Sequence, residues 1–408
     1  MTLRDDALKL YLENHGKLAV VSKVPIKTRE DLALAYTPGV AEPCKEIKEN
    51  KDLSFEYTCR GNMVAIVSDG TRVLGLGDIG PEAAMPVMEG KAALFKTFGD
   101  VDAVPICIDT KDPAKIIETV RFLQPSFAGI NLEDISSPKC YDIECELKKI
   151  CDIPVFHDDQ HGTAIACLAA VIGALRFVKK DMKTAKFVVN GCGAAGSAIG
   201  RLLISMGAEN VTMVDRFGAL YEGIDANLDR IQSYLATVTN KEHKKGTLAD
   251  IAKGADVLIG VSAPNVFTKE IIASMADKAI VFALANPVPE TSYADAIEAG
   301  AAVAGTGRSD SPNQVNNVTV FPGVFRGAID VRAKAITEEM KVAAVYAISE
   351  LIDEKDLRAD YVVPDAFDPR VAPAVAAAVA RVAMETGIAR IKVDPEEVRA
   401  NTMKRVGR

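Results

Sequence analysis

The stretch AKFVVNGCGAAGSAIG, residues 185–200, decides the fold of this chain. Its apolar run predicts a buried strand, and the spacing Gly191-x-Gly193-x-x-Gly196 predicts a tight turn that leads into a helix over residues 194–206. The N-terminus of such a helix offers backbone amides and the positive end of the helix dipole to a phosphate. The stretch therefore predicts a dinucleotide site in an α/β fold. The alternative is a glycine turn that binds no ligand.

The details of this motif bear on the choice of dinucleotide. Gly191 permits the turn, Gly193 lets the backbone approach the pyrophosphate, and Gly196 lets the helix pack closely on the strand. Asp215 ends the next predicted strand, where a carboxylate can bind the ribose hydroxyls. Asp215 would repel the 2′-phosphate of NADP, whereas the adjacent Arg216 could attract it. The sequence slightly favours NAD over NADP.

Short apolar runs alternate with longer amphipathic patterns along most of the chain, which predicts βα units and parallel sheets. The predicted strands are residues 63–69, 101–109, 127–134 and 153–159 in a first set, and 185–191, 210–215, 255–262, 278–286 and 301–307 in a second. We therefore predict an α/β fold with two domains, each with a mostly parallel sheet. The second is a Rossmann-type dinucleotide-binding domain, followed by a helical C-terminal tail.

The domain boundary is predicted where the first set of strands ends. Residues 1–157 would form the first domain, and residues 158–408 the second domain with its helical tail. The apolar residues 163–178 are predicted to form a core helix that bridges the two domains. In the tail, residues 332–352 have the 3.6-residue period of a helix.

Composition limits the kinds of partner and location. The chain has 408 residues and a net charge of −8, which does not favour nucleic acid or a membrane surface. The N-terminus has no uninterrupted apolar region typical of a signal peptide. The eight cysteines form no CxxC pair, so buried free thiols are favoured over a zinc cluster of Cys140, Cys145 and Cys151. We expect a cytoplasmic protein that acts on a small molecule.

Two neighbouring predicted strands end in pairs of acidic residues. Glu133-Asp134 ends one strand, and Asp158-Asp159 ends the next. Placed side by side, these carboxylates would repel one another unless a cation lay between them. Hard oxygen ligands suit Mg²⁺ or Mn²⁺. The alternative is that each acid caps the helix that follows it.

His157 and His161 flank the second acidic pair. Their i, i+4 spacing on a helix would suit a zinc pair, but the segment is predicted to be a turn that precedes a helix starting at residue 163. Hydrogen-bonding or structural roles are therefore favoured for both histidines.

Three further residues are candidates for chemistry. Lys91 begins an apolar helical stretch, where burial would lower its pKa and let it accept a proton. Arg72 lies in a glycine-rich loop and could hold a carboxylate with two hydrogen bonds. Tyr36 lies in a turn-rich segment, where a phenol near a site can donate a proton. Their alternatives are a solvated lysine, a surface arginine and a packing tyrosine.

Seven motifs together resemble those of the malic enzymes, particularly the short prokaryotic type. They are AYTPGVAEP (35–43), VSDGTRVLGLGDIGPEAAMPVMEGKAALFKTFG (67–99), NLEDISSP (131–138), IPVFHDDQHGTA (153–164), GCGAAGSAIG (191–200), ALANPVPE (283–290) and NNVTVFPGVFRGA (316–328). The resemblance covers nearly the whole chain, from about residue 20 to residue 385, with the motifs in the order of the family.

The resemblance implies a role for each matching residue. Tyr36 is implied as the general acid and Lys91 as the general base, also in contact with substrate. The implied metal ligands are Glu133, Asp134 and Asp159, with Asp158 beside them. The implied malate-binding residues are Arg72, Asn286 and Asn317, and the implied dinucleotide-binding residues are Gly191, Gly193, Ala194, Ala195, Gly196, Asp215 and Asn286.

The resemblance also implies an activity and an assembly. The expected reaction is the oxidative decarboxylation of (S)-malate to pyruvate and CO₂ by a homodimer or higher homo-oligomer, with NAD or NADP and a divalent metal. Three alternatives stay open: a metal-independent amino-acid dehydrogenase, a relative that decarboxylates oxaloacetate or converts malate to lactate, and a dinucleotide-sensing protein without turnover.

Overall fold

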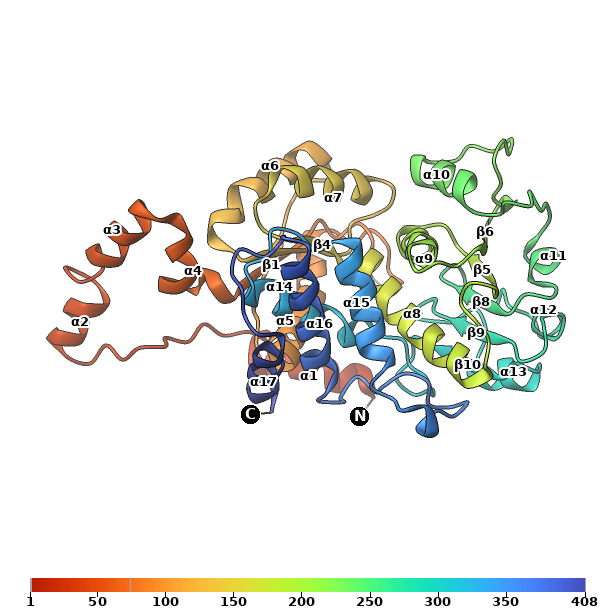
Figure 1. The fold of residues 1–408 in the computed structure, drawn as a ribbon. Coiled ribbons are helices and arrows are strands. Elements are labelled where there is room, and N and C mark those ends of the chain that lie inside the picture. Colours follow the sequence, from red (N-terminus) through yellow and green to blue (C-terminus); the bar gives the residue numbers. More distant parts are fainter. Residues whose placement is uncertain (1, 74, 408) are drawn as a thin grey trace.

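The computed structural model describes residues 2–73 and 75–407 and contains two separate sheets (Figure 1). The first sheet holds β1 (Met63–Ser68), β2 (Asp102–Cys107), β3 (Gly129–Leu132) and β4 (Val155–His157). Its strands are all parallel and lie in the order β2-β1-β3-β4. Val64, Ile66, Ile130 and Leu132 are fully buried, since both faces of a parallel sheet are covered by helices.

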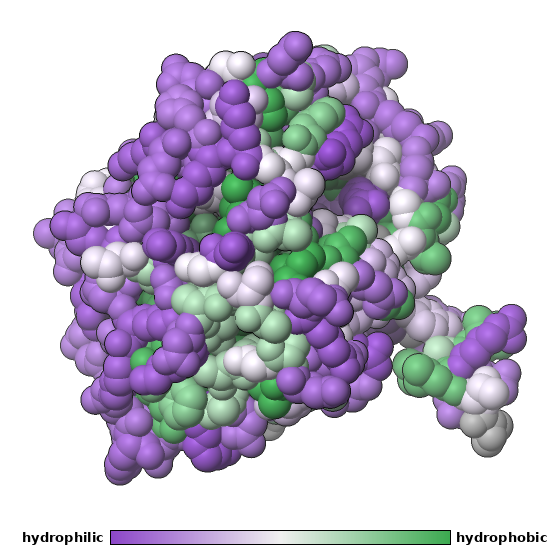
Figure 2. All heavy atoms as spheres, turned by 90° about the vertical axis from the view of Figure 1, so that its right-hand side faces the viewer, coloured by the Kyte–Doolittle hydropathy of each residue, from purple (hydrophilic) through white to green (hydrophobic). Residues whose placement is uncertain are grey.

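The second sheet has six strands in the order β10-β9-β8-β5-β6-β7. They are β5 (Lys186–Asn190), β6 (Asn210–Asp215), β7 (Gly218–Ala219), β8 (Val257–Gly260), β9 (Ile280–Ala283) and β10 (Val303–Thr306). The first five in this order pair in parallel, and the short β7 pairs antiparallel with β6. The predicted α/β class with two mostly parallel sheets is confirmed, while β7 was not predicted. On the face of the molecule shown in Figure 2, hydrophilic residues surround hydrophobic and intermediate areas in the middle and lower part of the view.

Helices connect the strands of each sheet. In the first half they are α5 (Pro81–Gly99), α6 (Pro113–Leu123) and α7 (Lys139–Ile150). In the second half they are α9 (Ala194–Ser205), α10 (Arg230–Val238), α11 (Leu248–Ala252), α12 (Lys269–Ala273) and α13 (Tyr293–Glu298). Short 3₁₀ turns lie at Lys51–Leu53, Cys59–Asn62, Gln124–Ser126, Asn317–Thr319 and Glu354–Asp356.

Helix α8 (Asp158–Val178) joins the two halves, and it begins earlier than the sequence predicts. The acidic pair belongs to its first turn, so the prediction of a turn before residue 163 is wrong. Negative charges near a helix N-terminus interact favourably with the helix dipole, which supports this early start. By length and composition α8 is the one described helix that could cross a membrane, but 83% of its most apolar window is buried inside the protein. It is a core helix, as the sequence predicts.

The C-terminal helices return to the first half of the chain. They are α14 (Phe321–Asp330), α15 (Glu338–Ser349), α16 (Val371–Glu385) and α17 (Pro395–Val406). Phe325 of α14 packs edge-on against Phe95 of α5 and Phe156 of β4, with ring centroids 5.3 and 5.8 Å apart. The tail therefore completes the core of the first half. The helix predicted over residues 332–352 starts only at Glu338, where Thr337 accepts a capping hydrogen bond from the amide of Met340.

Part of the N-terminal region extends away from this body, although α1 (Leu3–Asn14) itself lies against α5, where Tyr11 donates to the carbonyl of Pro86 at 3.2 Å. After α1 come α2 (Arg29–Ala35), α3 (Ala41–Glu49) and α4 (Ser54–Tyr57). We call residues 18–57 the arm; α2 and α3 extend away from the rest of the molecule at the left of Figure 1. No residue of the arm is buried. Its exposed apolar side chains include Val20, Val21, Leu34 and Tyr57.

Candidate active site

A cavity of about 990 Å³ lies between the two halves, at the carboxyl ends of strands from both sheets. In open α/β sheets this edge is where ligands bind. From the first half the cavity is lined by Arg72, Lys91, Glu133, Asp134, Asp158 and Asp159, and from the second by Gly193, Ala194, Ala195, Asn286 and Asn317. Most of the site residues predicted from the sequence are thus brought to one cavity.

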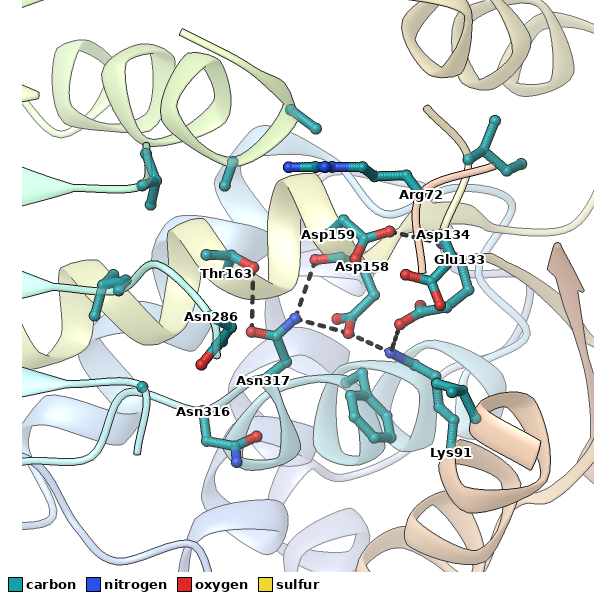
Figure 3. Close-up of a pocket in the computed structure, with 18 of the residues that line it drawn as sticks. Arg72, Lys91, Glu133, Asp134, Asp158, Asp159, Thr163, Asn286, Asn316 and Asn317 are labelled. Carbon is teal, nitrogen blue, oxygen red and sulfur yellow. Dashed lines mark hydrogen bonds and ion pairs between the residues drawn. The ribbon is translucent and has the colours of Figure 1, made fainter. Parts of the chain in front are cut away.

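Lys91 is held deep in this cavity by two carboxylates (Figure 3). Its side chain extends from the middle of α5, and its Nζ atom donates hydrogen bonds to Glu133 Oε1 at 2.7 Å and to Asp158 Oδ2. Nζ also lies 4.4 Å from the centre of the Phe321 ring, a cation–π distance. Asn131 Nδ2 donates to the other oxygen of Glu133 at 3.0 Å. The lysine is thus buried and paired, not solvated.

The expectation that burial lowers the pKa of Lys91 is wrong for this arrangement. Burial does favour the neutral amine, but the negative charges of Asp158, Glu133 and Asp159 outweigh it, and the pKa of Lys91 is raised. The reason is that the same pocket that buries the amine supplies three carboxylates. With these carboxylates around it and no ligand bound, Lys91 carries its proton at neutral pH.

Asp158 is the central acceptor of the site. Its side chain is fully buried, and Oδ2 accepts hydrogen bonds from both Lys91 Nζ and Asn317 Nδ2, the latter at 3.0 Å. The side chain folds back over the first turn of α8, where a Cβ at Gly162 would lie 1.8 Å from Oδ1. Asp158 is therefore a partner of the lysine. Asp158 and Gly162 are four residues apart, so they lie on the same face of a helix. The sequence could have indicated that Asp158 folds back over Gly162 only if residues 158–162 had been predicted to be helical.

Thr163 orients Asn317, and sequence reasoning missed it. Thr163 Oγ1 donates to Asn317 Oδ1 at 3.2 Å, while the amide nitrogen of Asn317 faces Asp158. Each end of the amide thus has a partner of the required kind. Thr163 gave no signal in the sequence beyond its place in the same motif.

Glu133, Asp134 and Asp159 border the cavity, and the backbone amide of Asp134 donates to Asp159 Oδ2 at 2.8 Å. Burial raises the pKa of Glu133 to about 8, with Lys91 opposing and Asp159 adding to the shift. Burial and the charge of Asp134 raise the pKa of Asp159 to about 7. Negative charge is crowded here, and a bound cation would relieve it.

These residues suit a metal ion by the type of their ligand atoms and by their negative charge. Hard carboxylate oxygens bordering a solvent-accessible cavity suit Mg²⁺ or Mn²⁺. Within residues 2–73 and 75–407, however, no group of three or more acidic, histidine or cysteine side chains converges closely enough to hold an ion. Lys91 supplies the positive charge beside Glu133. His161 is occupied by a hydrogen bond to Glu144 at 2.8 Å.

Other predicted residues are placed in different ways. Arg72 is exposed beside the cavity, and its backbone amide donates to the carbonyl of Asp134 at 3.0 Å. Asn286 follows β9 and is also exposed to the cavity. Tyr36 lies on the arm with 66% of its surface exposed, and it does not line the cavity. The structure does not bring Tyr36 together with the other candidates within one chain.

The glycine turn has the form that the sequence predicts. Gly191 has a φ of +107°, which favours glycine, and a Cβ at Gly196 would lie 1.8 Å from the carbonyl oxygen of Gly191. Gly193 lines the cavity, and apart from its own backbone and neighbouring chain atoms no described atom comes within 4 Å of the place where its Cβ would be. Helix α9 begins at Ala194, so its first amides face the cavity.

Asp215 ends β6 and is fixed by two hydrogen bonds. Its Oδ1 accepts from the amide of Arg216 at 2.7 Å, and its Oδ2 accepts from Gln232 Nε2 at 2.8 Å. Asp215 does not border the cavity itself. The sequence gave no sign of Gln232, which comes from the distant helix α10.

Two family models match the chain. The one described as "Malic enzyme, N-terminal domain" matches residues 15–148, and the one described as "Malic enzyme, NAD binding domain" matches residues 160–384. Together they cover most of the chain.

The chain is similar to three named relatives. The "Bifunctional malic/malolactic enzyme" of Bacillus subtilis (strain 168) is 57% identical over 99% of this chain and 98% of its own length. The "NAD-dependent malic enzyme" of Geobacillus stearothermophilus is 51% identical over 92% of this chain and 78% of its own length. The "NADP-dependent malic enzyme" of Escherichia coli (strain K12) is 47% identical over 92% of this chain, which matches 51% of that protein.

A solved structure is similar over the full chain. The crystal structure of malic enzyme from Pyrococcus horikoshii superimposes with a TM-score of 0.96 at 46% identity, covering 100% of this chain and 96% of that one.

Proposed function

This chain belongs to the malic enzyme family, and from that premise we propose how its residues carry out the oxidative decarboxylation of (S)-malate to pyruvate and CO₂ with NAD(P). One observation carries the proposal: Lys91, held between Glu133 and Asp158, shares a cavity with the glycine turn that opens α9. A proton acceptor and a hydride acceptor can therefore both reach one small substrate there.

Lys91 is the proposed general base for the C2 hydroxyl of malate. Its ammonium is stabilised by the surrounding carboxylates, so its pKa falls once the charges of Glu133 and Asp159 are neutralised. Arg72, Asn286 and Asn317 border the same cavity and are the proposed malate-binding residues. Arg72 can pair with a carboxylate, and the two amides can donate hydrogen bonds.

Glu133, Asp134 and Asp159 are the proposed ligands of Mg²⁺ or Mn²⁺. When bound, such an ion supplies Lewis-acid polarisation of the substrate oxygen at C2. The raised pKa values of Glu133 and Asp159 are in keeping with this assignment, because burial first, and then the charges of neighbouring carboxylates, disfavour ionisation of both groups, and a bound cation would offset these effects. Asp158 is assigned instead to holding Lys91 and Asn317.

Tyr36 is the proposed general acid that protonates C3, and we assign it to the cavity of a second copy of the chain in a homodimer. The arm carries Tyr36 away from its own cavity and leaves apolar side chains such as Val21 and Leu34 exposed. An extended segment with an unburied apolar surface is suited to packing against a partner subunit. The cavity of each subunit would then be completed by the arm of the other.

NAD is the proposed coenzyme, with NADP as the alternative. Asp215 is oriented by Gln232 and by the amide of Arg216, so it can accept hydrogen bonds from ribose hydroxyls. Among relatives of the chain, one is named for NAD and another for NADP. A cytoplasmic location stays a prediction.

The proposal is tested by incubating the purified protein with malate, Mn²⁺ and either NAD or NADP, and measuring pyruvate, CO₂ and reduced coenzyme. We expect equal amounts of all three products and their loss after EDTA treatment. Lactate without net coenzyme reduction would instead support the malolactic reaction, since a relative at 57% identity is named for both activities. Oxaloacetate is tested as a substrate in the same assay, because its decarboxylation is a proposed side activity.

A further inference from the structure

Glu144 is a buried carboxylate outside the cavity with an unusual set of donors. It lies on α7, and its side chain is 7% exposed. The donors from the start of α8 are the backbone amide of His157 at 3.3 Å, Gln160 Nε2 at 3.2 Å and His161 Nε2 at 2.8 Å. Lys148 from its own helix adds an ion pair at 2.7 Å. Except for this lysine, its partners belong to residues 157–161.

This carboxylate takes the place of a capping residue for α8. The N-cap residue of α8, His157, makes no side-chain capping hydrogen bond. A helix start that lacks a local cap needs another acceptor for its amides, and a negative charge there also interacts with the helix dipole. Glu144 supplies the negative charge from a neighbouring helix and accepts from one of these amides, that of the N-cap residue His157.

The segment that Glu144 holds carries the acidic pair of the active site. Asp158 and Asp159 form the first turn of α8, between the residues that bind Glu144. Asp158 faces Lys91, and Asp159 faces the amide of Asp134. A shift of the first turn would therefore move both carboxylates relative to the cavity.

The same segment is tied to two other helices through its side chains. His161 Nδ1 lies 3.1 Å from Lys341 Nζ of α15, and Arg201 Nη2 of α9 donates to Gln160 Oε1 at 3.2 Å. Gln160 and His161 are each bound at one end to Glu144 and at the other end to one of these helices. The carboxylate thus anchors a network that joins α7, α8, α9 and α15.

We infer that Glu144 is a positioning residue that sets the orientation of Asp159 for metal binding and of Asp158 for holding Lys91. This inference rests on the proposed function, in which Asp159 is a metal ligand. Glu144 does not line the cavity and touches neither of the two aspartate side chains. It acts through the backbone and side chains of the first turn of α8. Partners bound directly to a metal ligand contribute about 10–100-fold to metal affinity, and we expect the lower end of this range for Glu144, which binds the turn that carries the ligand.

The test compares Mn²⁺ binding by the wild-type protein and by Glu144→Gln, measured by the EPR signal of free Mn²⁺ without substrate turnover. Glutamine keeps the size of the side chain but removes its negative charge. Its amide N–H group would also face the N–H donors of residues 157–161, which Glu144 accepts from in the wild type. We expect the Mn²⁺ dissociation constant to rise at least about ten-fold, with NADH binding, followed by fluorescence, changed less than about two-fold.

The matched control is Asp256→Asn. Asp256 precedes the amino end of β8, whereas the cavity lies at the carboxyl ends of the strands, and it does not line the cavity. Its carboxylate accepts from the amide of Lys186 at 2.8 Å and pairs with Lys180 at 2.6 Å. Asp256→Asn should lower the melting temperature and leave Mn²⁺ affinity unchanged. Glu144→Asp, which keeps the charge but shortens the side chain, decides the question if Glu144→Gln does not fold, and its Mn²⁺ dissociation constant should rise several-fold.

The outcomes separate this inference from the proposed function. If the wild-type protein does not bind Mn²⁺, the proposed metal site fails. If the wild-type protein binds Mn²⁺ and the folded Glu144 variants bind it equally well, the positioning role is overturned while the metal site stands. A fall in melting temperature with unchanged Mn²⁺ affinity also overturns it, because Glu144 would then serve stability alone.

Discussion

Gly162 lies against the side chain of Asp158 one helical turn away, and a Cβ at this glycine would come within 1.8 Å of Asp158 Oδ1. The absence of a side chain at Gly162 is what allows the aspartate to fold back over α8. From that position Asp158 holds both Lys91 and Asn317. The geometry of the proposed base thus depends on a residue that touches no substrate.

Gly162→Ala is therefore expected to displace Asp158 and lower kcat for malate oxidation by about a hundred-fold, since an error of about 1 Å in a catalytic group can have that effect. The control is Gly173→Ala on the same helix, where a Cβ would lie 1.8 Å from the carbonyl oxygen of Val362. Both variants should lose stability. If kcat per folded molecule falls equally in the two, the specific effect on Asp158 is refuted.

Lys91→Ala is expected to lower malate oxidation by about 10²–10⁴-fold while NADH still binds, because the variant lacks the proposed proton acceptor but keeps the glycine turn. Lys96→Ala on the same helix is the control, since Lys96 is exposed and pairs with Asp100 and Asp102. Steady-state kinetics and NADH fluorescence check both variants. Unchanged turnover in Lys91→Ala removes this residue from the mechanism.

Asp159→Asn is expected to weaken Mn²⁺ binding by at least about ten-fold and to raise the Mn²⁺ concentration needed for half-maximal activity. The amide keeps the hydrogen-bond acceptor for the amide of Asp134 but removes one negative charge. Calorimetry of Mn²⁺ binding checks the prediction. An unaltered affinity would exclude Asp159 from the metal site.

Mixing two inactive variants tests whether Tyr36 acts on a partner subunit. In a heterodimer of Tyr36→Phe and Lys91→Ala, one cavity would contain both wild-type side chains and the other neither. Random mixing should therefore restore about a quarter of the wild-type activity. No activity would return if Tyr36 served its own chain. Tyr57→Phe, which changes another exposed tyrosine of the arm, should stay active throughout.

Lys341 provides a pH test of the network behind the active site. Burial lowers its pKa to about 8 although Glu338 opposes the shift, and Lys148, Glu144 and His161 also face its amine. Between pH 8 and the ordinary value of 10.5, the unfolded chain keeps a proton that the folded chain has lost. The free energy of unfolding should then rise with pH by up to about 3 kcal/mol. Urea unfolding of the wild type and of Lys341→Met measures the free energy of unfolding of each. The difference between the two free energies should change steadily between pH 8 and pH 10.5. A difference that stays constant over this pH range would contradict the prediction.

Local patterns predicted the fold well but not the start of α8. The glycine turn and the alternation of apolar runs depend on nearby residues, so every strand of both sheets except the short β7 was found within a few positions. The first turn of α8 is different, because the amide of His157 and the side chains of Gln160 and His161 are bound by Glu144, at the middle of another helix. No window around residues 157–163 contains that information.

The residues of the site were largely predicted from local patterns, as the strands were, but features that depend on distant parts of the chain were not. The acidic strand ends, Lys91 and the glycine turn reach one cavity because the carboxyl ends of parallel strands meet at one edge. The direction of the Lys91 pKa was wrong, since it depends on which carboxylates the fold places beside the amine. The position of Tyr36 on an extended arm also had no local signal.

The central claim is that carboxylates from two neighbouring strand ends hold one divalent ion beside the nicotinamide site. A crystal grown with Mn²⁺, NADH and a malate analogue tests it most directly, through the anomalous difference signal of manganese. The account predicts one peak within about 2.0–2.4 Å of oxygens from Glu133, Asp134 and Asp159. A peak elsewhere, or these three carboxylates turned away from it, would contradict the account.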